Sequence, residues 1–372
     1  MTTTVNNEHK NIKVPNLRFP EFQGEWEEYT LQDVVTFSNG KAHENCVNDD
    51  GDYILVNSKF VSTNGQVQKR VTSQLSPLHK SQFVMVMSDL PNGKALAKCF
   101  YVEEDNKYTL NQRVCSFTSN DGNVSRFLMY QINRNKYYLR FDDGINQTNL
   151  KKSEVLSCPV FIPIVREQEK IATLLCKIDE RIATQNKIID KLQSLIKGIA
   201  QKIVRSNKPN VRLYECVECS SSTQQESEVC EQGAYPVYGA NGIVGYLDDY
   251  NTEGEAVYII KDGSGVGTVS YVTGKCSATG TLNTLQAKDG YSLQYLYYLL
   301  KVFNFEPYKT GMAIPHIYFK DYGKAKVFCP SYTEQLQYAR LLSAIDSKLS
   351  VEKNTLRKLS LQKQYLLRQM FI

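Results

Sequence analysis

The strongest constraint on the fold of this chain is an internal repeat. The stretch VFIPIVREQEKIATLLCKID begins at Val160, and the closely similar stretch VFCPSYTEQLQYARLLSAID begins at Val327. At this offset of 167 residues, Gln168 corresponds to Gln335. Self-similarity over such a long period usually defines the whole architecture, because each copy encodes the same structural unit. The repeat therefore predicts two homologous units.

The repeat extends toward the N-terminus with small changes of offset. FLMYQI at Phe127 matches YLYYLL at Tyr295 at an offset of 168, and TLN at Thr109 matches TLN at Thr281 at an offset of 172. Such changes indicate that loops of different length separate related elements. The chain is predicted to be a tandem duplication with units at roughly 25–205 and 208–372.

Each unit ends in a segment whose apolar residues are spaced alternately by four and three positions. This spacing is the a/d pattern of a coiled coil and predicts two long helices. The stripe of the first helix is Ile171, Leu175, Ile178, Ile182, Ile189, Leu192, Ile196 and Ile199. The stripe of the second helix is Leu342, Ile345, Leu349, Leu356, Leu359 and Leu366.

The same segments predict where the helices start and how they pair. Pro163 and Pro330 precede the periodic residues, and Ser331 with Glu334 has the spacing of a capping box. Each helix would run about forty residues, or ~60 Å. Each helix could pack on its own globular unit, but a strict stripe of this length favours pairing of the two helices. A pseudo-two-fold axis between homologous units would make that pair antiparallel.

Polar residues interrupt both stripes. Gln185 and Glu352 occupy matching positions, and Lys363 falls in the register of Ile196. Such residues can fix the alignment of two helices at some cost in stability, or they can simply be tolerated where the seam is wet. The sequence leaves both interpretations open.

The globular parts combine strand and helix patterns. SQFVMVMSDLPNGKALAKCFYV and EAVYIIKDGSGVGTVSYVTGK contain β-branched and aromatic runs broken by turns, whereas RFLMYQINRNKYYLR and YSLQYLYYLLKVF are helical in pattern. The fold class is therefore α+β, a tandem duplication of two α/β domains with small sheets, each followed by a long helix. The predicted segments are 1–26 (N-terminal segment), 27–159 (first domain), 160–205 (long helix), 206–326 (second domain) and 327–372 (long helix).

Composition narrows the class of protein. The chain is 42% hydrophobic and 22% charged, as in soluble globular domains, and its net charge of +5 permits nucleic-acid binding without requiring it. No apolar run approaches the ~18 residues of a membrane helix and no signal peptide is evident, so we expect a cytoplasmic protein without a membrane partner. The 10 cysteines are scattered, and the lone CxxC of Cys216 and Cys219 favours packed thiols over a zinc site.

No catalytic motif is evident. DGSGVGT at Asp262 lies between strand-like runs with no helix pattern after it, which favours a tight hairpin over a phosphate loop. The Asn/Asp-Pro-Pro-Tyr/Phe motif of adenine methyltransferases does not occur, and no nucleophile or metal group surrounds the histidines. We expect a non-catalytic chain that binds no cofactor and no metal.

Four segments together carry a family resemblance. VPNLRFPEFQGEWEEYTLQDV, the segment FIP..REQEKIATLL, YPVYGANGIVGYLDDY with DGSGVGTV, and the second P...EQ segment resemble the specificity subunit of type I restriction-modification systems, in order and over nearly the whole chain. The resemblance implies that each globular domain is a target recognition domain for one half of a bipartite sequence in double-stranded DNA, and that the helices set the spacing. It also implies partners: two methyltransferase subunits that use S-adenosylmethionine to methylate adenine, and restriction subunits that use ATP and Mg²⁺.

The two domains differ strongly in sequence, so the two half-sites should also differ. Base edges are read by side chains such as Arg, Lys, Asn and Gln on loops that enter a groove. Candidates in the first domain are Lys59, Asn64, Gln66, Gln68, Lys69, Arg70, Asn92, Lys94, Asn111, Gln112, Arg113, Gln147, Asn149 and Lys151. Candidates in the second are Tyr238, Asn241, Lys261, Ser264, Thr281, Asn283 and His316. Phosphate contacts could come from Lys136, Arg140, Lys151 and Lys152, and each of these residues could instead be an ordinary solvated side chain.

Two other functions remain open from the sequence. A structural coiled-coil adaptor would have no DNA specificity and no salt-sensitive affinity for duplex DNA. A fused methyltransferase-nuclease would bind a cofactor, although its motifs are missing.

Overall fold

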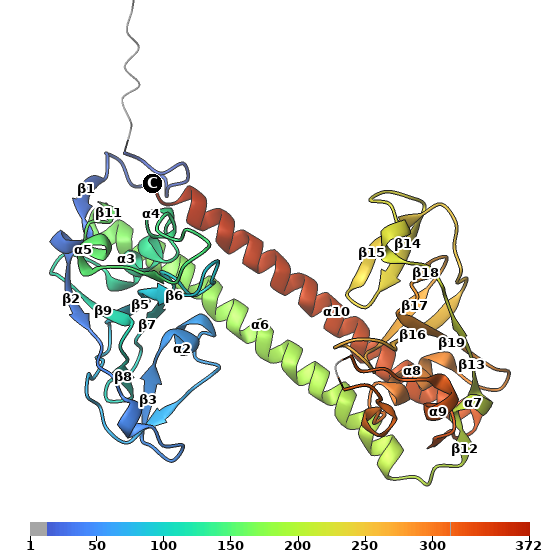
Figure 1. Ribbon diagram of the computed structural model, residues 1–372. Coiled ribbons are helices and arrows are strands. Elements are labelled where there is room, and N and C mark those ends of the chain that lie inside the picture. The colour runs from blue at the N-terminus through green and yellow to red at the C-terminus, as the bar shows by residue number, and fades with distance from the viewer. Residues whose placement is uncertain (1–12, 313) are drawn as a thin grey trace, which may run out of the picture. The chain divides into compact units, whose positions relative to one another are not determined.

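The computed structural model describes residues 13–312 and 314–372, which fall into two compact units. Unit 1 comprises Met1–Ala183 with Arg357–Ile372, and unit 2 comprises Thr184–Leu356. Each unit contains one globular domain and parts of both long helices (Figure 1). This division differs from the five predicted segments because each long helix is shared between the units.

Domain 1 contains two main sheets and two short strand pairs. The sheet orders are β2-β9-β5-β7 and β4-β3-β8, and the pairs are β1-β11 and β6-β10. The strands are β1 (Glu27–Thr30), β2 (Val35–Asn39), β3 (Tyr53–Val56), β4 (Arg70–Val71), β5 (Phe83–Val86), β6 (Ser88–Asp89), β7 (Cys99–Tyr101), β8 (Tyr108–Leu110), β9 (Val114–Ser119), β10 (Thr148–Asn149) and β11 (Pro159–Ile162). The helices are α1 (Leu31–Val34), η1 (Glu44–Cys46), α2 (Ser58–Ser62), α3 (Ser125–Ile132), α4 (Lys136–Leu139) and α5 (Lys152–Leu156).

Domain 2 repeats this topology. Its main sheets have the orders β13-β19-β16-β17 and β15-β14-β18, and β12 pairs with β20. The strands are β12 (Val211–Arg212), β13 (Val217–Ser221), β14 (Tyr235–Gly239), β15 (Gly242–Leu247), β16 (Glu255–Ile260), β17 (Val269–Thr273), β18 (Ser277–Ala278), β19 (Leu282–Ala287) and β20 (Lys326–Val327). The helices are α7 (Leu213–Cys216), η2 (Glu226–Glu228), α8 (Leu293–Leu300), η3 (Glu306–Tyr308) and α9 (Phe319–Tyr322).

The strand at the middle of each domain is buried on both faces. In β5, Phe83 and Met85 enter the core beneath α3, whereas Val84 and Val86 enter the second core beside β3. In β16, alternate residues divide between two cores in the same way. An uninterrupted apolar run is what a strand covered on both sides requires, because its side chains alternate between the faces.

The strand pairing corrects one detail of the predicted repeat. Val35 of β2 pairs with Ser119 of β9, and Val217 of β13 pairs with Ala287 of β19. Strand β9 therefore corresponds to β19, at an offset of 168 residues. The TLN match at an offset of 172 is therefore wrong, because it relates the end of β8 to the start of β19. β16 and β17 do form a hairpin, but residues 261–268 connect them, so the turn is not tight.

The long helices are α6 (Val165–Arg205) and α10 (Tyr332–Gln369). The predicted helical segments began too early: Val160 lies in strand β11, and Val327 lies in β20. Pro163 and Pro330 separate each strand from its helix, since proline cannot donate a hydrogen bond within a strand or a helix. At the start of α10, Ser331 N donates to Glu334 Oε2 at 3.2 Å and Glu334 N donates to Ser331 Oγ at 3.5 Å, which confirms the expected capping box.

Within each unit the helices pack antiparallel. In unit 1, Lys363 Nζ lies 2.5 Å from Asp179 Oδ1, and Met370 shares a core with Ile171. In unit 2, Gln185 Nε2 donates to the carbonyl oxygen of Glu352 at 3.1 Å. The pairing agrees with the predicted antiparallel coiled coil, and every residue of the two predicted stripes is buried or half-buried.

The repeated EQ motif attaches each domain to its helix. Gln168 Oε1 accepts a hydrogen bond from Val124 N at 2.8 Å, just before α3, and its Nε2 donates to Pro163 O at 2.9 Å. Gln335 makes the same two bonds in unit 2, from Ser292 N at 2.9 Å and to Pro330 O at 2.9 Å. Both glutamines are fully buried. The motif recurs because the same connection is built twice.

The N-terminal segment closes unit 1. Arg18 forms a two-pronged ion pair with the buried carboxylate of Glu167, at 2.8 and 2.7 Å. Leu17 N donates to Gln369 O at 2.8 Å, beside the end of α10. Trp26 packs edge-on against Phe371. Residues far apart in the sequence therefore complete one core.

Candidate nucleic-acid interface

A row of backbone hydrogen bonds brings four segments of domain 1 to one edge. Asn111 N donates to Val56 O at 3.1 Å, which joins the carboxyl ends of the parallel strands β3 and β8. Met87 N donates to Arg113 O at 2.9 Å, and Leu150 N donates to Met87 O at 2.8 Å. The segments that follow β3, β5 and β8 therefore meet the loop that precedes α5.

Domain 2 has the same row. Thr279 N donates to Tyr238 O, Lys261 N donates to Thr281 O and Ile317 N donates to Lys261 O, each at 2.9 Å. These bonds follow the strands equivalent to those of domain 1. We call the two sets of segments the loop edges: residues 57–70, 87–94, 111–113 and 144–151 in domain 1, and residues 238–241, 261–267, 279–281, 309–312 and 314–317 in domain 2.

All the candidate DNA-binding residues of domain 1 lie on its loop edge. Most of them are exposed, and Asn111 is half-buried. Asn64, Asn92 and Arg113 have positive φ, of 49°, 55° and 70°, so their backbones form sharp turns there. The exposed members are Lys59, Asn64, Gln66, Gln68, Lys69, Arg70, Asn92, Lys94, Gln112, Arg113, Gln147, Asn149 and Lys151.

Two of the four segments are fastened to each other by side chains. Asn92 Nδ2 donates to Gly144 O at 3.1 Å. Gln147 Nε2 donates to Ser88 Oγ at 2.9 Å and to Asn149 Oδ1 at 3.3 Å. These amides also have atoms that face solvent, so the same groups that hold the loops can offer hydrogen bonds outward.

The segment between α2 and β4 carries several exposed donors. Gln68 Nε2 donates to Gly65 O at 2.9 Å, and Arg70 Nη1 donates to Gly51 O at 3.0 Å. Gln112 Nε2 donates to Glu44 Oε1 at 2.9 Å. Each side chain therefore uses only part of its hydrogen-bonding capacity within the domain.

The loop edge of domain 2 has a different chemistry. His316 Nδ1 lies 2.7 Å from Asp262 Oδ1, and both side chains are 36% exposed. Ser264 and Asn241 are exposed at two turns, and Lys261 is half-buried. An imidazole-carboxylate pair thus stands where domain 1 has Asn149 and Ser88, because the bridges Asn149–Ser88 and His316–Asp262 are equivalent.

Three predicted residues of domain 2 are partly or fully engaged inside the domain. Asn283 is wrong as a DNA contact: it is 3% exposed, donates to Tyr322 Oη at 2.9 Å and accepts from Ser221 Oγ at 3.0 Å, so its amide is used inside the domain. Thr281 is half-buried and shares a hydrogen bond with Thr279. Tyr238 packs against Tyr258, and burial raises the pKa of its hydroxyl.

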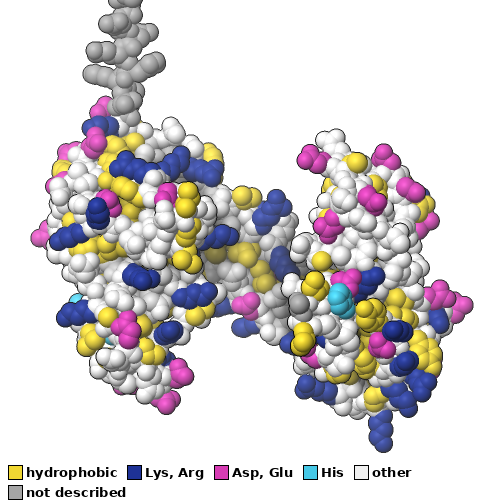
Figure 2. All heavy atoms as spheres, viewed as in Figure 1, with side chains coloured by type: hydrophobic (Ala, Val, Ile, Leu, Met, Phe, Trp, Pro, Cys, Tyr) yellow, Lys and Arg dark blue, Asp and Glu magenta, His cyan; other side chains and the backbone are white. Residues whose placement is uncertain are grey.

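Positive charge is present in domain 1. Lys151 and Lys152 are exposed at the end of the loop edge, and Lys136 and Arg140 are exposed at α4. Lys and Arg side chains are spread over the viewed face of both units, among hydrophobic patches (Figure 2). Asp and Glu side chains lie among them on the same face, so the basic residues named in domain 1 are the candidates for contact with a phosphate backbone.

The sequence missed the apolar members of the edges. Leu90, Ile145, Met312 and Ile314 are all well exposed there. No sequence signal marks them, because an isolated apolar residue in a loop has no periodicity to assign it to core or surface.

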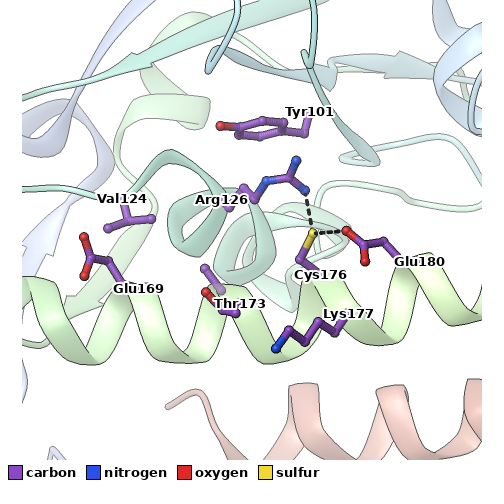
Figure 3. A pocket seen from close by; sticks show the side chains of 9 residues that line it. Tyr101, Val124, Arg126, Glu169, Thr173, Cys176, Lys177 and Glu180 are labelled. Atoms are coloured by element: carbon purple, nitrogen blue, oxygen red, sulfur yellow. Dashed lines mark hydrogen bonds between the residues drawn. The ribbon is translucent and has the colours of Figure 1, made fainter.

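A groove of about 320 Å³ lies elsewhere in unit 1, between domain 1 and α6 (Figure 3). Arg126 from α3 lies over the Tyr101 ring, 3.9 Å from its centroid, pairs with Glu103 and lies 3.2 Å from Cys176 Sγ. Burial raises the pKa of Cys176. These contacts tie α6 to the domain, and the arginine is already paired within the unit.

No metal centre is evident in the part of the chain that the structure describes, where no three His, Cys, Asp or Glu side chains gather as metal ligands. Cys216 lies 3.7 Å from Cys329 in the core of unit 2, sulfur to sulfur, rather than forming a site with Cys219. Among the described residues, no helix has both the length and the apolar character needed to cross a membrane.

Comparison with known proteins identifies the two domains. The family model described as the type I restriction modification DNA specificity domain matches residues 23–194 and again residues 210–361. The chain belongs to this specificity-domain family. Both copies of the predicted duplication are therefore specificity domains.

Curated relatives carry the same description. The specificity subunit of the type I restriction enzyme EcoprrI of Escherichia coli is 27% identical over 117 residues, covering 32% of this chain and 29% of the relative. A putative type I specificity subunit of Haemophilus influenzae is 27% identical, covering 34% and 33%. A putative type I specificity subunit of Mycoplasma genitalium is 25% identical over 256 residues, covering 63% and 66%. The matches to the first two thus span about a third of those relatives' lengths.

Solved structures share the fold. The S subunit of a type I restriction-modification system from M. genitalium superposes with a TM-score of 0.66 at 18% identity, covering 96% of this chain and 99% of that one. A chain from a structural study of the assembly and conformational transition of a type I restriction-modification system superposes with a TM-score of 0.52 at 15% identity, covering 93% and 97%.

Proposed function

We propose that this chain is the DNA sequence-recognition subunit of a type I restriction-modification complex. Each specificity domain would read one half of an asymmetric, bipartite site in double-stranded DNA. The chain itself would be non-catalytic and bind no cofactor. It would direct two methyltransferase subunits, which use S-adenosylmethionine to methylate adenine N6, and restriction subunits that use ATP and Mg²⁺.

The observation that carries this proposal is the pair of loop edges. Both domains use the same row of backbone bonds, yet they present different side chains at equivalent positions. Asn149 beside Ser88 in domain 1 is replaced by His316 beside Asp262 in domain 2. A shared scaffold with different donors and acceptors is what two readers of different half-sites require.

The chemistry of domain 1 suits the major groove. Asn and Gln amides can pair with adenine, and Lys or Arg with guanine. Gln147, Asn149 and Arg113 supply these groups from adjoining segments, while Lys151 and Lys152 are placed to contact phosphates. Together they can position the duplex and discriminate its bases.

The long helices would set the spacing between the half-sites. α6 contributes to the cores of both units, and so does α10. A continuous helix has a fixed rise of ~1.5 Å per residue, so its length is a rigid measure of distance. Insertion of one heptad into each helix should therefore change the number of unspecified bases between the half-sites while leaving both half-sites unchanged.

The test is to express the chain with the methyltransferase subunits of its own system, in a host without other adenine methylation. Single-molecule sequencing of the host DNA would then map N6-methyladenine. We expect methylation at one split, asymmetric motif that requires this chain. The matched control expresses the methyltransferase subunits alone.

Methylation that is absent, or that persists unchanged without this chain, would overturn the proposal. A chain that joins the complex but has no salt-sensitive affinity for duplex DNA would instead be a structural coiled-coil adaptor.

A further inference from the structure

The two most exposed large apolar side chains of the described residues lie on the two loop edges. Ile145 is 80% exposed in domain 1, and Met312 is 106% exposed in domain 2. Other exposed apolar residues of the described chain reach at most 68%, at Leu90. The rest of the described chain therefore covers little of either side chain.

Ile145 and Met312 occupy equivalent positions. The backbone row makes Leu150 the counterpart of Ile317, because both donate to the residue that follows the central strand. Counting back five residues in each loop gives Ile145 in domain 1 and Met312 in domain 2. Two domains with otherwise different edges therefore expose an apolar side chain at the same place.

A glycine with positive φ precedes each of them. Gly144 has φ of 71°, and Gly311 has φ of 86°. At Gly311 an added Cβ would lie only 2.3 Å from the carbonyl oxygen of Ile314, so the turn requires glycine. The chain thus turns sharply just before each of these exposed apolar residues.

The loop of domain 1 is held in this shape. The Asp143 carboxylate accepts hydrogen bonds from Ile145 N at 2.9 Å and from Asn146 N at 2.8 Å. These bonds hold the pKa of Asp143 near 2. Asn92 fastens the same loop through Gly144 O. Ile145 is therefore kept in solvent by a built loop.

The loop of domain 2 is held by different bonds, but it too keeps its apolar residue, Met312, in solvent. Thr310 and His316 exchange backbone hydrogen bonds of 2.9 and 2.8 Å, which closes the loop on either side of Met312. The His316–Asp262 pair ties the closed loop to the segment after β16. Different bracing of an equivalent apolar tip indicates that the tip itself has a role common to both domains.

That common role cannot be the reading of a base. Residues that discriminate bases should differ between domains with different half-sites, as Asn149 and His316 do. A feature retained in both domains serves a step that both half-sites share. Ile and Met belong to the set of apolar side chains that proteins insert between base steps, where they partly unstack the bases. The exposed lysines and arginines of the domain 1 edge favour DNA as the occupant of that surface.

We propose that Ile145 and Met312 are wedges, each entering the stack of its own half-site and opening one base step when the duplex binds. This inference rests on the proposed function, since it assumes that the loop edges face DNA. No bond is made or broken. The wedge distorts the duplex mechanically, while the amides beside it read the bases.

The experiment uses the assembled methyltransferase complex and duplexes carrying its split site as mapped by sequencing. Single 2-aminopurine substitutions, whose fluorescence rises when the base unstacks, are placed at successive positions of each half-site. We expect Ile145→Ala to abolish the increase at one step of one half-site and to leave the other half-site unchanged. Met312→Ala should do the reverse, and Ile145→Leu should keep the signal.

Leu361→Ala is the matched control. Leu361 is an exposed apolar residue, 54% exposed, but it lies on α10 and outside both loop edges. We expect this variant to keep the fluorescence of both half-sites. Signals from base flipping by the methyltransferase should be the same in all variants, which separates flipping from unstacking by the wedge.

The outcomes separate the two proposals. If the wild-type complex shows no preference for the split site, the proposed function fails. If it binds the site but both alanine variants keep every fluorescence increase, the wedges are overturned and the function stands. If the effect of Ile145→Ala disappears when thymine is replaced by uracil, the side chain touches methyl groups in the groove, and the wedge is again overturned.

Discussion

Gln185 and Glu352 occupy the same position in the two repeats, and they are hydrogen bonded to each other. Gln185 Nε2 reaches both the carbonyl oxygen and the carboxylate of Glu352. Gln185 is 8% exposed, so this polar contact lies within the apolar stripe. The sequence left open whether these residues align the helices or are merely tolerated. Their direct contact favours alignment.

Gln185→Leu should lower the free energy of unfolding by about 1–2 kcal/mol, because the half-buried Glu352 carboxylate loses its donor. The double variant Gln185→Leu with Glu352→Leu should recover most of this loss, because two leucines can pack together without leaving a polar group unpaired. Urea unfolding of both singles and the double gives the coupling energy. Gln193→Leu, at an exposed site on α6, is the control. Additive losses would show that the pair does not act as a unit.

Gln168→Met should lower the free energy of unfolding by about 2–4 kcal/mol. It leaves the amide of Val124 and the carbonyl of Pro163 without partners in a buried site. Amide hydrogen exchange should show the loss of protection at the start of α3. Gln335→Met should cause the same loss of protection at the start of α8. Gln362→Met, exposed on α10, should change little. If Gln168→Met and Gln335→Met exchanged no faster at α3 and α8 than the control Gln362→Met, the proposed role of the EQ motif would be contradicted.

The cysteines should differ in their pH-dependent reactivity. Burial raises the pKa of Cys219 to about 11, whereas Cys230 is exposed. Alkylation near neutral pH, followed by mass spectrometry, should label Cys230 first, and Cys219 only as the pH approaches 11. Because the folded state holds the Cys219 proton more tightly than the unfolded state, this group stabilises the fold below about pH 8.5 and loses that contribution as the pH rises toward 11. Early labelling of Cys219 would mean that β13 opens readily.

Two substitutions on the loop edge of domain 1 should have different effects, one on base specificity and the other on affinity for DNA. Gln147→Ala should relax base preference at one position of a single half-site, as methylation mapping can show. Lys151→Gln should weaken binding to all duplexes. The plot of log affinity for DNA against log salt concentration should become shallower, its slope changing by about 1. Lys348→Gln, exposed on α10, is the charge-matched control. An altered motif in the Lys151 variant would show that this lysine contacts a base.

The architecture could be predicted because the long helices carry their own signal. A stripe with four-and-three spacing specifies both the helix and the face that it buries, as at Ile171 and Leu349, without knowledge of the rest of the fold. The duplicated EQ motif then indicated two equivalent units. Local sequence patterns sufficed for both conclusions.

The loop edges could be predicted only in part. Asn111 and Gln147 were named as separate candidates, but the bonds that join their segments depend on strand pairing between distant residues. Asn283 was misplaced because the register of β19, which turns its amide inward, is fixed by β13 and β16. Ile145 was missed because exposure of a single loop residue is a property of the folded surface.

Unit 1 is assembled from two stretches of chain that are synthesised at different times. Its core contains Trp26 and Leu175, and also Met370 near the end of α10. A ribosome that has completed residues 1–183 has therefore made a domain that still lacks part of its own interior. Until residues 357–372 emerge, the core residues that they cover are open to chaperones and proteases, and a premature stop anywhere in domain 2 leaves both domains unfinished.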